Sequence, residues 1–212
     1  MIVVAIDGPA GAGKSTIGRA LAARLGLRYL DTGAQYRSVA VAMMRRGIDL
    51  ADATTIEATA PEVQIEVLDE QLLIDGVESS AAIRTPEASQ AASRVAVLPG
   101  VRRELARQQR AWASAHGGGV IEGRDIGTVV FPEANLKLFV TASADVRAKR
   151  RSIDTGENPA DVLSAIRERD GRDAGREHAP LMTADGARVI DTSDRSVEDI
   201  IDEIVDLLGA RR

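Results

Sequence analysis

A phosphate-binding loop motif close to the N-terminus limits what this chain can fold into more than any other feature of its sequence. Residues 8–16 read GPAGAGKST and fill the pattern G-x-x-x-x-G-K-[ST]. The apolar, β-branched residues 2–6 precede the motif and predict a buried strand, and residues 17–25 follow it with helical spacing. A strand, a glycine loop and a helix in this order direct backbone N–H groups and a helix N-terminus at an anion. The motif therefore predicts that the chain binds a nucleoside triphosphate.

Each kind of residue in the loop has a chemical role in that binding. The glycines let the backbone approach phosphate oxygens and adopt positive φ. We expect Lys14 to bridge the β- and γ-phosphates and the Ser15 hydroxyl to bind the Mg²⁺ that accompanies ATP, with Thr16 near the α-phosphate. A glycine-rich turn without a ligand is the alternative, and the coincidence of motif, strand and helix argues against it. The predicted ATP-binding residues are Gly8, Pro9, Ala10, Gly11, Ala12, Gly13, Lys14, Ser15 and Thr16.

Composition narrows the class of protein. The 212 residues are 44% hydrophobic, which is enough to bury the core of one domain with an insertion or of two small ones. No apolar run approaches the roughly 18 residues of a transmembrane helix, and the chain begins directly with a predicted strand, which leaves no room for a signal peptide. The absence of cysteine excludes disulfides and cysteine-bound metals. We expect a cytoplasmic protein that does not bind membranes.

The charge of the chain bears on its partners. The formal net charge of −5 argues against a general nucleic-acid-binding protein. Only three of the 27 basic residues are lysine, so arginine predominates. Codon bias explains such a preference, and so does a need for planar donors that bind phosphate in a bidentate way. The positions of the arginines have to decide between these two explanations.

The rest of the sequence alternates strand and helix patterns, which predicts an α/β fold with a parallel sheet. A hairpin at residues 63–74 interrupts the alternation, and we place it in an inserted subdomain of about residues 33–115. In the helix predicted from residue 143 to about 151, we expect Ala144 and Arg147 on the exposed side. The other predicted strands are 28–31, 120–122, 136–140 and 188–191, and the other predicted helices are 34–46, 86 toward 98, 101–115, 159 onward and 196–208.

The phosphate-binding loop alone leaves several classes of protein open. A guanine-specific switch protein needs the sequence N-K-x-D, which is missing, and a motor is usually longer than 212 residues. A small-molecule kinase remains. A sugar hydroxyl that accepts phosphate requires a carboxylate base, whereas a nucleoside monophosphate is already an anion and requires cations that hold two phosphates in line. A nucleotide acceptor therefore predicts arginines in the inserted and lid segments.

Arginines do occur at such positions. Arg37 begins a predicted helix after Asp31-Thr32-Gly33, and Arg124 directly follows a predicted strand, where ligand sites of α/β proteins gather. Further along, Arg169, Arg172 and Arg176 have spacings that place them on one helix face.

An exposed helix with ion pairs along its surface is the alternative explanation for the last three arginines. Gly171 and Gly175 interrupt that run and favour a movable lid, which we place at about residues 152–182. Arg150 and Arg151 are further candidates for contact with the donor triphosphate, a solvated helix end being the alternative.

Several longer segments together resemble the bacterial cytidylate kinase family. They are DTGAQYR at 31–37, GRDIGTVVFP at 123–132, the arginine-rich segment, APL at 179–181 and IDTS at 190–193. The resemblance spans about residues 3–195. It implies a single P-loop kinase domain over residues 1–212, with a three-layer α/β fold, a nucleoside-monophosphate-binding insertion and a mobile lid. It also implies transfer of phosphate from MgATP to CMP and dCMP.

The resemblance further implies roles for individual residues. Asp125 would accept from the N4 amino group of cytosine, whereas the O4 of uracil would meet a like charge there. Ser93 and Arg102 would also read the base, Arg169 and Asp173 would bind the ribose, and Thr32, Arg37, Arg124 and Arg176 would hold the acceptor phosphate. The implied catalytic residues are Lys14, Arg124 and Arg176, and the implied metal ligand is Ser15.

Two residues depart from the family's usual pattern. Glu122 stands where aspartate is usual, and Gln35 stands where an apolar residue is usual. Gln35 suggests one alternative function, a kinase for a modified pyrimidine nucleotide. Glu122 suggests another, a nucleotide-binding regulator without catalysis. The expected partners are the small-molecule substrates ATP and CMP or dCMP, with no nucleic acid and no membrane, and we expect a monomer.

Overall fold

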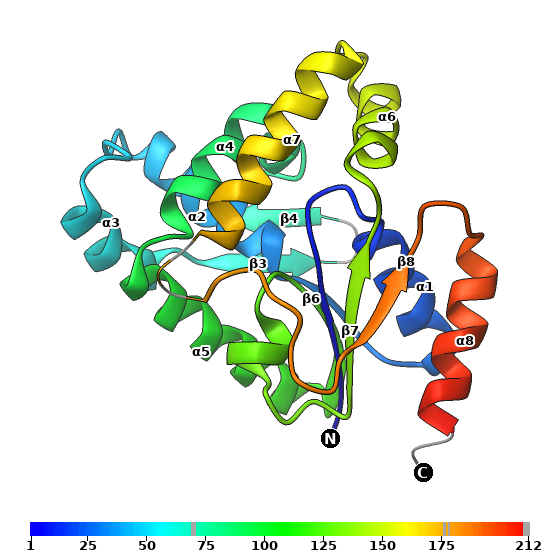
Figure 1. Cartoon of the computed structure of the whole chain (residues 1–212). Helices are drawn as coiled ribbons and strands as arrows, with labels where there is room; N and C mark the ends of the chain where they lie inside the picture. Colours follow the sequence, from blue (N-terminus) through cyan, green and yellow to red (C-terminus); the bar gives the residue numbers. More distant parts are fainter. Residues whose placement is uncertain (69–70, 176, 178, 210–212) are drawn as a thin grey trace. The chain divides into compact units, whose positions relative to one another are not determined.

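The computed structural model describes residues 1–68, 71–175, 177 and 179–209 (Figure 1). The chain divides into two units. Unit 1 comprises Met1–Leu30 and Trp112–Arg212, and unit 2 comprises Asp31–Ala111. Each unit has its own sheet and its own hydrophobic core.

Unit 1 is built on a five-stranded sheet with the order β2-β6-β1-β7-β8. The central strand β1 pairs in parallel with β6 and β7, and β7 pairs in parallel with β8. This pairing confirms the predicted α/β fold with a parallel sheet. The strands are β1 (Ile2–Asp7), β2 (Tyr29–Asp31), β6 (Gly118–Glu122), β7 (Leu136–Thr141) and β8 (Arg188–Asp191).

Two helices cover one face of this sheet. Helix α1 (Lys14–Leu25) follows the phosphate-binding loop, and α8 (Val197–Gly209) is the last helix of the described chain. Ile17 and Leu21 of α1 pack with Ile200 and Ile204 of α8 and with buried side chains of the strands. All five residues of β6 are buried, as expected for a parallel strand that is covered on both faces.

Helices α6 (Ala144–Thr155) and α7 (Pro159–Ala174) lie beyond the carboxyl ends of the strands in Figure 1. The side chains of Ser143 and Asn158 cap their N-termini, and Val162 and Ile166 of α7 pack on Ala148 of α6. Because α7 continues through Gly171 and ends at Gly175, most of the predicted lid is helical. The mobility of that segment stays a prediction.

The predicted exposure of Arg147 is wrong. Only 5% of this residue is accessible, because the face of α6 that carries it packs against α7 and the phosphate-binding loop. The local helical pattern, which has few apolar residues, could not indicate this contact, because the partners of Arg147 come from distant parts of the chain.

Unit 2 consists of helices around a small antiparallel sheet with the order β3-β4-β5. Strands β3 and β4 confirm the predicted hairpin. Strand β5 and helix α3 were not predicted from the sequence. The elements are α2 (Thr32–Arg45), α3 (Ala53–Thr59), η1 (Ala60–Glu62), β3 (Ile65–Leu68), β4 (Gln71–Ile74), β5 (Val77–Glu78), η2 (Ala82–Arg84), α4 (Pro86–Val95) and α5 (Pro99–Ala115), the last of which continues into unit 1.

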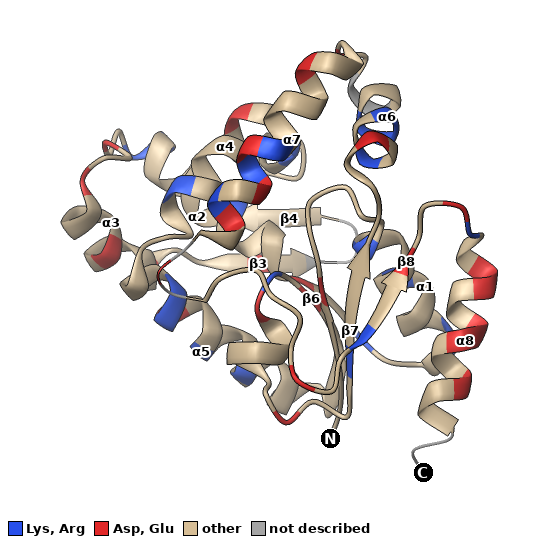
Figure 2. Cartoon of the chain, in the orientation of Figure 1, with Lys and Arg blue, Asp and Glu red and all other residues tan. Residues whose placement is uncertain are grey.

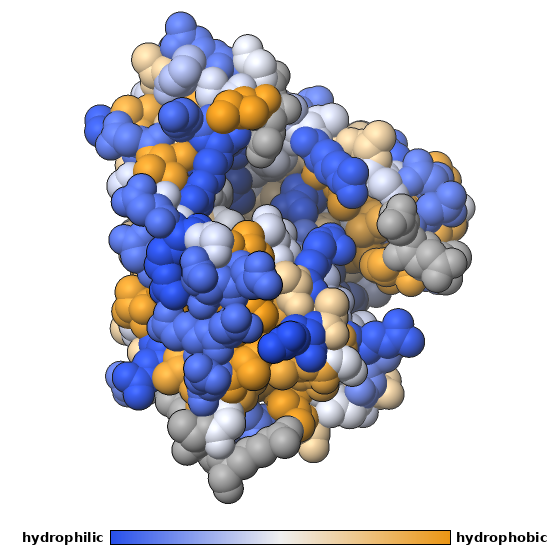
Figure 3. All heavy atoms as spheres, turned by 90° about the vertical axis from the view of Figure 1, so that its right-hand side faces the viewer, coloured by the Kyte–Doolittle hydropathy of each residue, from blue (hydrophilic) through white to orange (hydrophobic). Residues whose placement is uncertain are grey.

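Charged residues are distributed unevenly over the helices of unit 1. Figure 2 shows acidic segments along α8 and a mixture of basic and acidic segments on α7. The face on which α8 lies carries interspersed hydrophilic and hydrophobic residues (Figure 3). Over the described ranges, no helix is both long enough and apolar enough to cross a membrane.

The core of unit 1 gives a prediction about stability. Leu138 is 1% exposed on β7, between strands β1 and β8. We expect Leu138→Ala to lower the free energy of unfolding by about 2–5 kcal/mol, because the surrounding sheet cannot close the resulting cavity. Val189→Ala, at a 59% exposed position on β8, is the matched control and should change it by no more than roughly 0.5 kcal/mol. Urea unfolding followed by circular dichroism measures both, and equal effects would contradict the assigned core.

Candidate active site

The phosphate-binding loop connects β1 to α1 at the carboxyl end of the sheet (Figure 1). Gly8 has a φ of 147°, and a Cβ atom there would lie 1.9 Å from the carbonyl oxygen of Val140. Only glycine fits this position, because the loop passes directly over β7. The ammonium group of Lys14 reaches back across the loop and donates a hydrogen bond to the carbonyl of Pro9 at 2.7 Å.

Side chains outside the loop hold two more of its carbonyl groups. Arg147 Nη1 donates to the carbonyl of Ala10 at 3.1 Å, and Thr192 Oγ1 donates to the carbonyl of Ala12 at 3.0 Å. Arg150 in turn donates to Thr192 Oγ1 at 2.9 Å. The C=O and N–H of one trans peptide point in opposite directions. Binding the carbonyls from outside therefore turns the following N–H groups away from these partners, as an anion site requires.

A hydroxyl and a carboxylate meet at the start of α1. Ser15 Oγ donates to Glu122 Oε1 at 2.6 Å, and Glu122 is 4% exposed at the end of β6. Hard oxygen donors of this kind suit Mg²⁺. The extra methylene of Glu122 does not remove its carboxylate from the loop. Among the residues that the structure describes, no group of three or more histidine, cysteine, aspartate or glutamate side chains forms a metal site.

Lys14 is buried among charged groups of both signs. Burial, followed by the positive charge of Arg124, lowers the pKa of Lys14 from its ordinary 10.5 to about 7. Arg169 acts in the same direction, whereas Glu122 and Asp7 oppose the change. The structure thus brings three predicted cations together beside the loop, and that arrangement favours a polyanionic ligand.

Asp173 is shared between two of the arginines. Its Oδ2 accepts a hydrogen bond from Arg124 Nε at 2.9 Å and lies 4.0 Å from Arg169 Nε. Asp173 is 1% exposed, so the two guanidinium groups compensate a carboxylate that is removed from water. The predicted residues of β6 and α7 consequently form one cluster. Arg176, the third predicted catalytic residue, lies outside the described residues.

Asp7 organises the segment that follows Arg124. Its two carboxylate oxygens accept hydrogen bonds from the backbone N–H groups of Ile126 and Gly127 at 2.8 and 2.7 Å. Burial raises the pKa of Asp7 from 3.8 to about 6, although these two N–H donors act in the opposite direction. The same segment forms a single π-helical turn, η3 (Ile126–Val130), which begins after the buried Asp125. Asp7 therefore fixes the backbone beside Asp125.

In unit 2, the start of α2 carries Thr32 and Arg37. Asp31 caps this helix by accepting from the N–H of Ala34 at 2.9 Å, and it also pairs with Arg37 Nη2 at 3.0 Å. Thr32 is 3% exposed in the first turn. A cationic side chain is thereby held at the N-terminus of a helix, where anions bind favourably.

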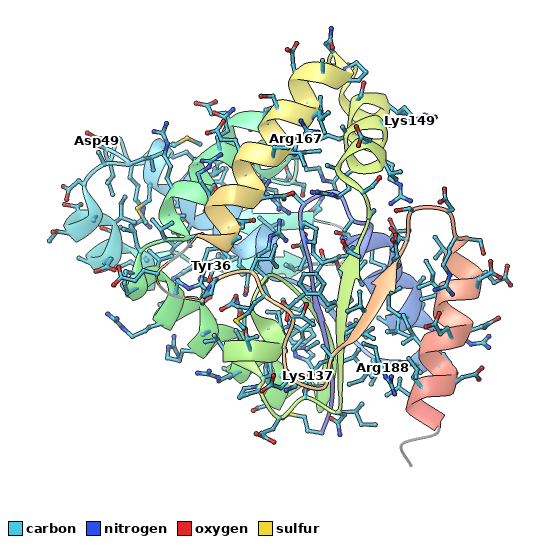
Figure 4. The ribbon with its side chains drawn as sticks, viewed as in Figure 1. Tyr36, Asp49, Lys137, Lys149, Arg167 and Arg188 are labelled. Carbon is cyan, nitrogen blue, oxygen red and sulfur yellow. The ribbon has the colours of Figure 1, made fainter. Side chains whose placement is uncertain are left out.

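Ser93 and Arg102 belong to the two following helices of unit 2. Arg102, 9% exposed on α5, donates to the carbonyl of Ala96 at 3.0 Å and lies 5.8 Å from the ring centre of Tyr36. Tyr36, which Figure 4 labels, belongs to α2. Ser93 is 7% exposed on α4, and its hydroxyl has no hydrogen-bond partner within the described part of the chain. A buried hydroxyl without a partner costs about 1–3 kcal/mol, which a ligand group would recover.

The unusual residue Gln35 also has a specific partner. Gln109 Nε2 of α5 donates to Gln35 Oε1 at 3.0 Å, and Gln109 is 1% exposed. A polar bridge between α2 and α5 therefore stands where an apolar contact would be ordinary.

The structure arranges the predicted residues in two sets, one in each unit. Lys14, Ser15, Arg124, Arg169 and Asp173 cluster in unit 1, and Asp125 lies on the segment that Asp7 fixes. Thr32, Arg37, Ser93 and Arg102 lie on the helices of unit 2. Lys137, labelled in Figure 4, lies near the amino end of β7, far along the strand from the loop.

Three residues near the loop were not predicted from the sequence. They are Asp7, Arg147 and Thr192. Asp7 had a recognisable signal, because a carboxylate ends an otherwise apolar strand directly before the loop. Thr192 belongs to the segment IDTS that contributes to the resemblance, whereas Arg147 had no such signal. No local pattern indicates the bonds of either residue to the loop, because their partners are separated from them by 180 and 137 residues of sequence, respectively.

Comparison with known proteins shows which family the chain resembles over its whole length. The family model for cytidylate kinase matches residues 4–210. A cytidylate kinase of Mycobacterium leprae (strain Br4923) is 45% identical over 99% of this chain and 96% of that protein. A cytidylate kinase of Rhizobium meliloti (strain 1021) is 46% identical over 92% of this chain and 90% of that protein.

Solved structures share the fold. A shikimate kinase from Bacteroides thetaiotaomicron superposes with a TM-score of 0.53 at 14% identity, covering 98% of both chains. At this identity the likeness concerns the fold alone, and it agrees with the predicted P-loop type of α/β architecture.

The lowered pKa of Lys14 predicts proton uptake on triphosphate binding. At pH 8, above the pKa of about 7, most ligand-free molecules have a neutral Lys14. A bound triphosphate places negative charge beside this amine and raises its pKa, so binding takes up close to one proton. Calorimetric titration with ATP in two buffers of different ionisation enthalpy measures this number. Lys14→Arg, which stays charged throughout, should bind without uptake. Equal uptake by both proteins would contradict the assignment.

Proposed function

The chain belongs to the cytidylate kinase family, and on that premise we propose that it transfers the γ-phosphoryl group of MgATP to CMP and dCMP, giving CDP or dCDP and ADP. The observation that carries this proposal is the cluster of three cations, the buried Lys14 and the partly exposed Arg124 and Arg169, beside the phosphate-binding loop. Such a cluster meets the main requirement of transfer between two anions, because both phosphates must be held despite their repulsion.

The donor triphosphate binds to the loop at residues 8–16. Lys14 bridges its β- and γ-phosphates, and the Mg²⁺ enters as part of the MgATP substrate. Ser15 and Glu122 supply hard oxygen atoms for that ion, as their contact at 2.6 Å supports. When bound, the ion neutralises charge that develops on the phosphate oxygens.

The residues that we propose for binding the acceptor phosphate are Thr32, Arg37, Arg124 and Arg176. Two features support this role. Arg124 is oriented by Asp173, and Arg37 is oriented by Asp31 at the N-terminus of α2. A CMP phosphate at neutral pH is already a nucleophilic anion, so no side chain has to remove a proton from it. The arginines neutralise charge and align the reacting oxygen with the γ-phosphorus.

The cytosine base is read by Asp125, Ser93 and Arg102. The buried carboxylate of Asp125 accepts from the N4 amino group of cytosine, and the hydroxyl of Ser93, which has no hydrogen-bond partner among the described residues, gains a hydrogen bond. Asp173 and Arg169 bind the ribose. We further propose that residues of about 152–182 act as a lid that keeps water from the γ-phosphate, since water would turn the kinase into an ATPase.

Gln35 favours a second candidate substrate, a CMP that carries a substituent on its base. Its bridge to Gln109 introduces polar groups beside Tyr36, close in sequence to Thr32 and Arg37. By contrast, the position of Glu122 supports catalysis over a silent regulator, because its carboxylate reaches Ser15 despite the longer side chain.

A panel of acceptors tests the proposed function. We expect rapid ADP formation from MgATP with CMP and dCMP, and little with UMP, because uracil places O4 against the Asp125 carboxylate. A coupled assay for ADP measures this, with 5-substituted CMP in the same panel. Turnover on the order of 1–100 per second is ordinary for kinases.

Other outcomes of this panel have distinct meanings. A faster reaction with the 5-substituted nucleotide identifies the second candidate substrate. Equal rates with UMP contradict the proposed reading of the base. Tight ATP binding without any CMP-dependent ADP formation contradicts the kinase and favours the regulator.

A substitution at Asp125 separates base recognition from phosphoryl transfer. We expect Asp125→Ala to reduce the preference for CMP over UMP by roughly 10–100-fold, corresponding to one good base contact of about 1–3 kcal/mol. The ratio of the kcat/KM values for the two acceptors measures the preference. Asp194→Ala, which removes an exposed carboxylate of unit 1, is the matched control and should leave it unchanged. An unchanged ratio in Asp125→Ala would refute the role of Asp125.

A further inference from the structure

A buried arginine connects the phosphate-binding loop to the helix that carries Arg169 and Asp173. Arg147 is only 5% exposed, although Lys149, two residues further along α6, points to solvent (Figure 4). Burial of a guanidinium ion costs free energy unless its N–H groups are bonded and its charge is paired. The bonding of Arg147 therefore bears on its function.

Arg147 donates hydrogen bonds to three separate segments of unit 1. Its Nη1 donates to the carbonyl of Ala10 in the loop at 3.1 Å, and its Nε donates to the carbonyl of Ala142 after β7 at 3.0 Å. Its Nη2 donates to Asp170 Oδ2 of α7 at 2.7 Å, a length typical of a charge-assisted bond. One side chain thus holds the loop, the end of a strand and a second helix.

The stem of Arg147 also contacts the loop. A Cβ atom built on Gly11 would lie 3.3 Å from Arg147 Cβ, and Gly11 has a φ of 76°. The loop therefore lies directly on α6 at this point. A change in the rotamer of Arg147 would disturb the loop through packing as well as through the bond to Ala10.

The bond to Asp170 acts on the turn of α7 that faces the cation cluster. Asp170 and Asp173 are three residues apart, so they lie on neighbouring parts of one helix face. Asp170 pairs with Arg147 and Asp173 pairs with Arg124. Two ion pairs thereby hold the same turn of α7: one joins it to Arg147 of α6, which also bonds to the phosphate-binding loop, and the other joins it to Arg124, which follows β6.

From this arrangement we propose that Arg147 is a positioning residue for phosphoryl transfer, an inference that rests on the function proposed above. Through Ala10 and Asp170 it sets the distance between the loop that holds the donor phosphates and the turn of α7 that contacts the acceptor nucleotide. A misplacement of about 1 Å between reacting groups slows a reaction on the order of 10²-fold. Arg147 accordingly controls the rate of transfer more than the affinity for either nucleotide.

A purely structural ion pair is the competing explanation. Such a pair affects the stability of unit 1, and its loss leaves kcat per folded molecule unchanged. The positioning role therefore predicts a lower kcat with little change in KM, whereas a purely structural pair predicts a lower thermal midpoint with an unchanged kcat.

Two single variants and their combination test the proposal. Arg147→Met removes the guanidinium and keeps the stem, and Asp170→Asn keeps the shape and removes the charge. We expect each to lower kcat on the order of 10²-fold, with the KM values for ATP and CMP changed by no more than about threefold. The combined variant should be no slower than Arg147→Met, because the two side chains act as a unit.

Matched controls come from the same helices. Lys149→Met removes an exposed cation from α6, and Glu168→Gln removes a 72% exposed carboxylate from α7. Both should retain the wild-type kcat. Arg147→Lys should recover only part of the rate, because one ammonium group cannot replace a planar guanidinium group that bonds to Ala10 and to Asp170 at the same time. Steady-state kinetics and thermal unfolding are measured for every variant.

The outcomes separate this inference from the proposed function. A wild type without CMP-dependent turnover contradicts the proposed function. An active wild type whose Asp170→Asn variant keeps its kcat overturns the positioning role alone, as do losses that multiply in the combined variant. If Arg147→Met does not fold, Asp170→Asn decides the question, because Asp170 lies at a partly exposed position with 27% of its side chain accessible.

Discussion

The concentration of positive charge beside the phosphate-binding loop is the constraint on which the rest of unit 1 depends. Burial, and after it the positive charges of Arg124 and Arg169, lower the pKa of Lys14. Repulsion between such cations is strong where water is excluded. Asp173 offsets part of it, and Glu122 and Asp7 offset more. These three carboxylates equal the three cations in number, and a bound polyanion would add negative charge beside Lys14 and raise its pKa.

The parallel sheet determines where these charged groups meet. The register of β1 and β6 places Ile6 opposite Glu122, and the register of β1 and β7 places Asp7 opposite Phe139. The carboxylates of Glu122 and Asp7 therefore both lie at the carboxyl end of the strands, beside the phosphate-binding loop. Because both faces of this sheet are covered, a slip of one residue would exchange side chains such as Ile6 between two packed faces, which makes the register strongly specified. The packing of the apolar strands thus determines where the charged residues of the site lie.

Local patterns in the sequence predicted most of this fold. Caps at Thr85 and Asn158 marked the starts of α4 and α7, because a capping side chain and a following proline act within a few residues. Helix α3 escaped prediction, since Ile56 is its single buried residue and it has no apolar periodicity.

The site was less predictable than the fold. The loop itself was recognisable, whereas roles for Ser93 and Arg102 came only from the resemblance, because nothing in their own segments distinguishes them from surface residues. The burial of Arg147 depends on partners in three distant segments, which no local pattern contains.

The structure gives a physical reason why arginine is preferred over lysine at several positions of this chain. Arg147, Arg124 and Arg150 each donate hydrogen bonds to two or more acceptors, which a single ammonium group could not reach together. Exposed arginines such as Arg172, 3.7 Å from Glu168, could be lysine without loss of a contact. Hydrogen bonding to several acceptors therefore accounts for these three arginines, and the exposed ones are left for codon bias to explain.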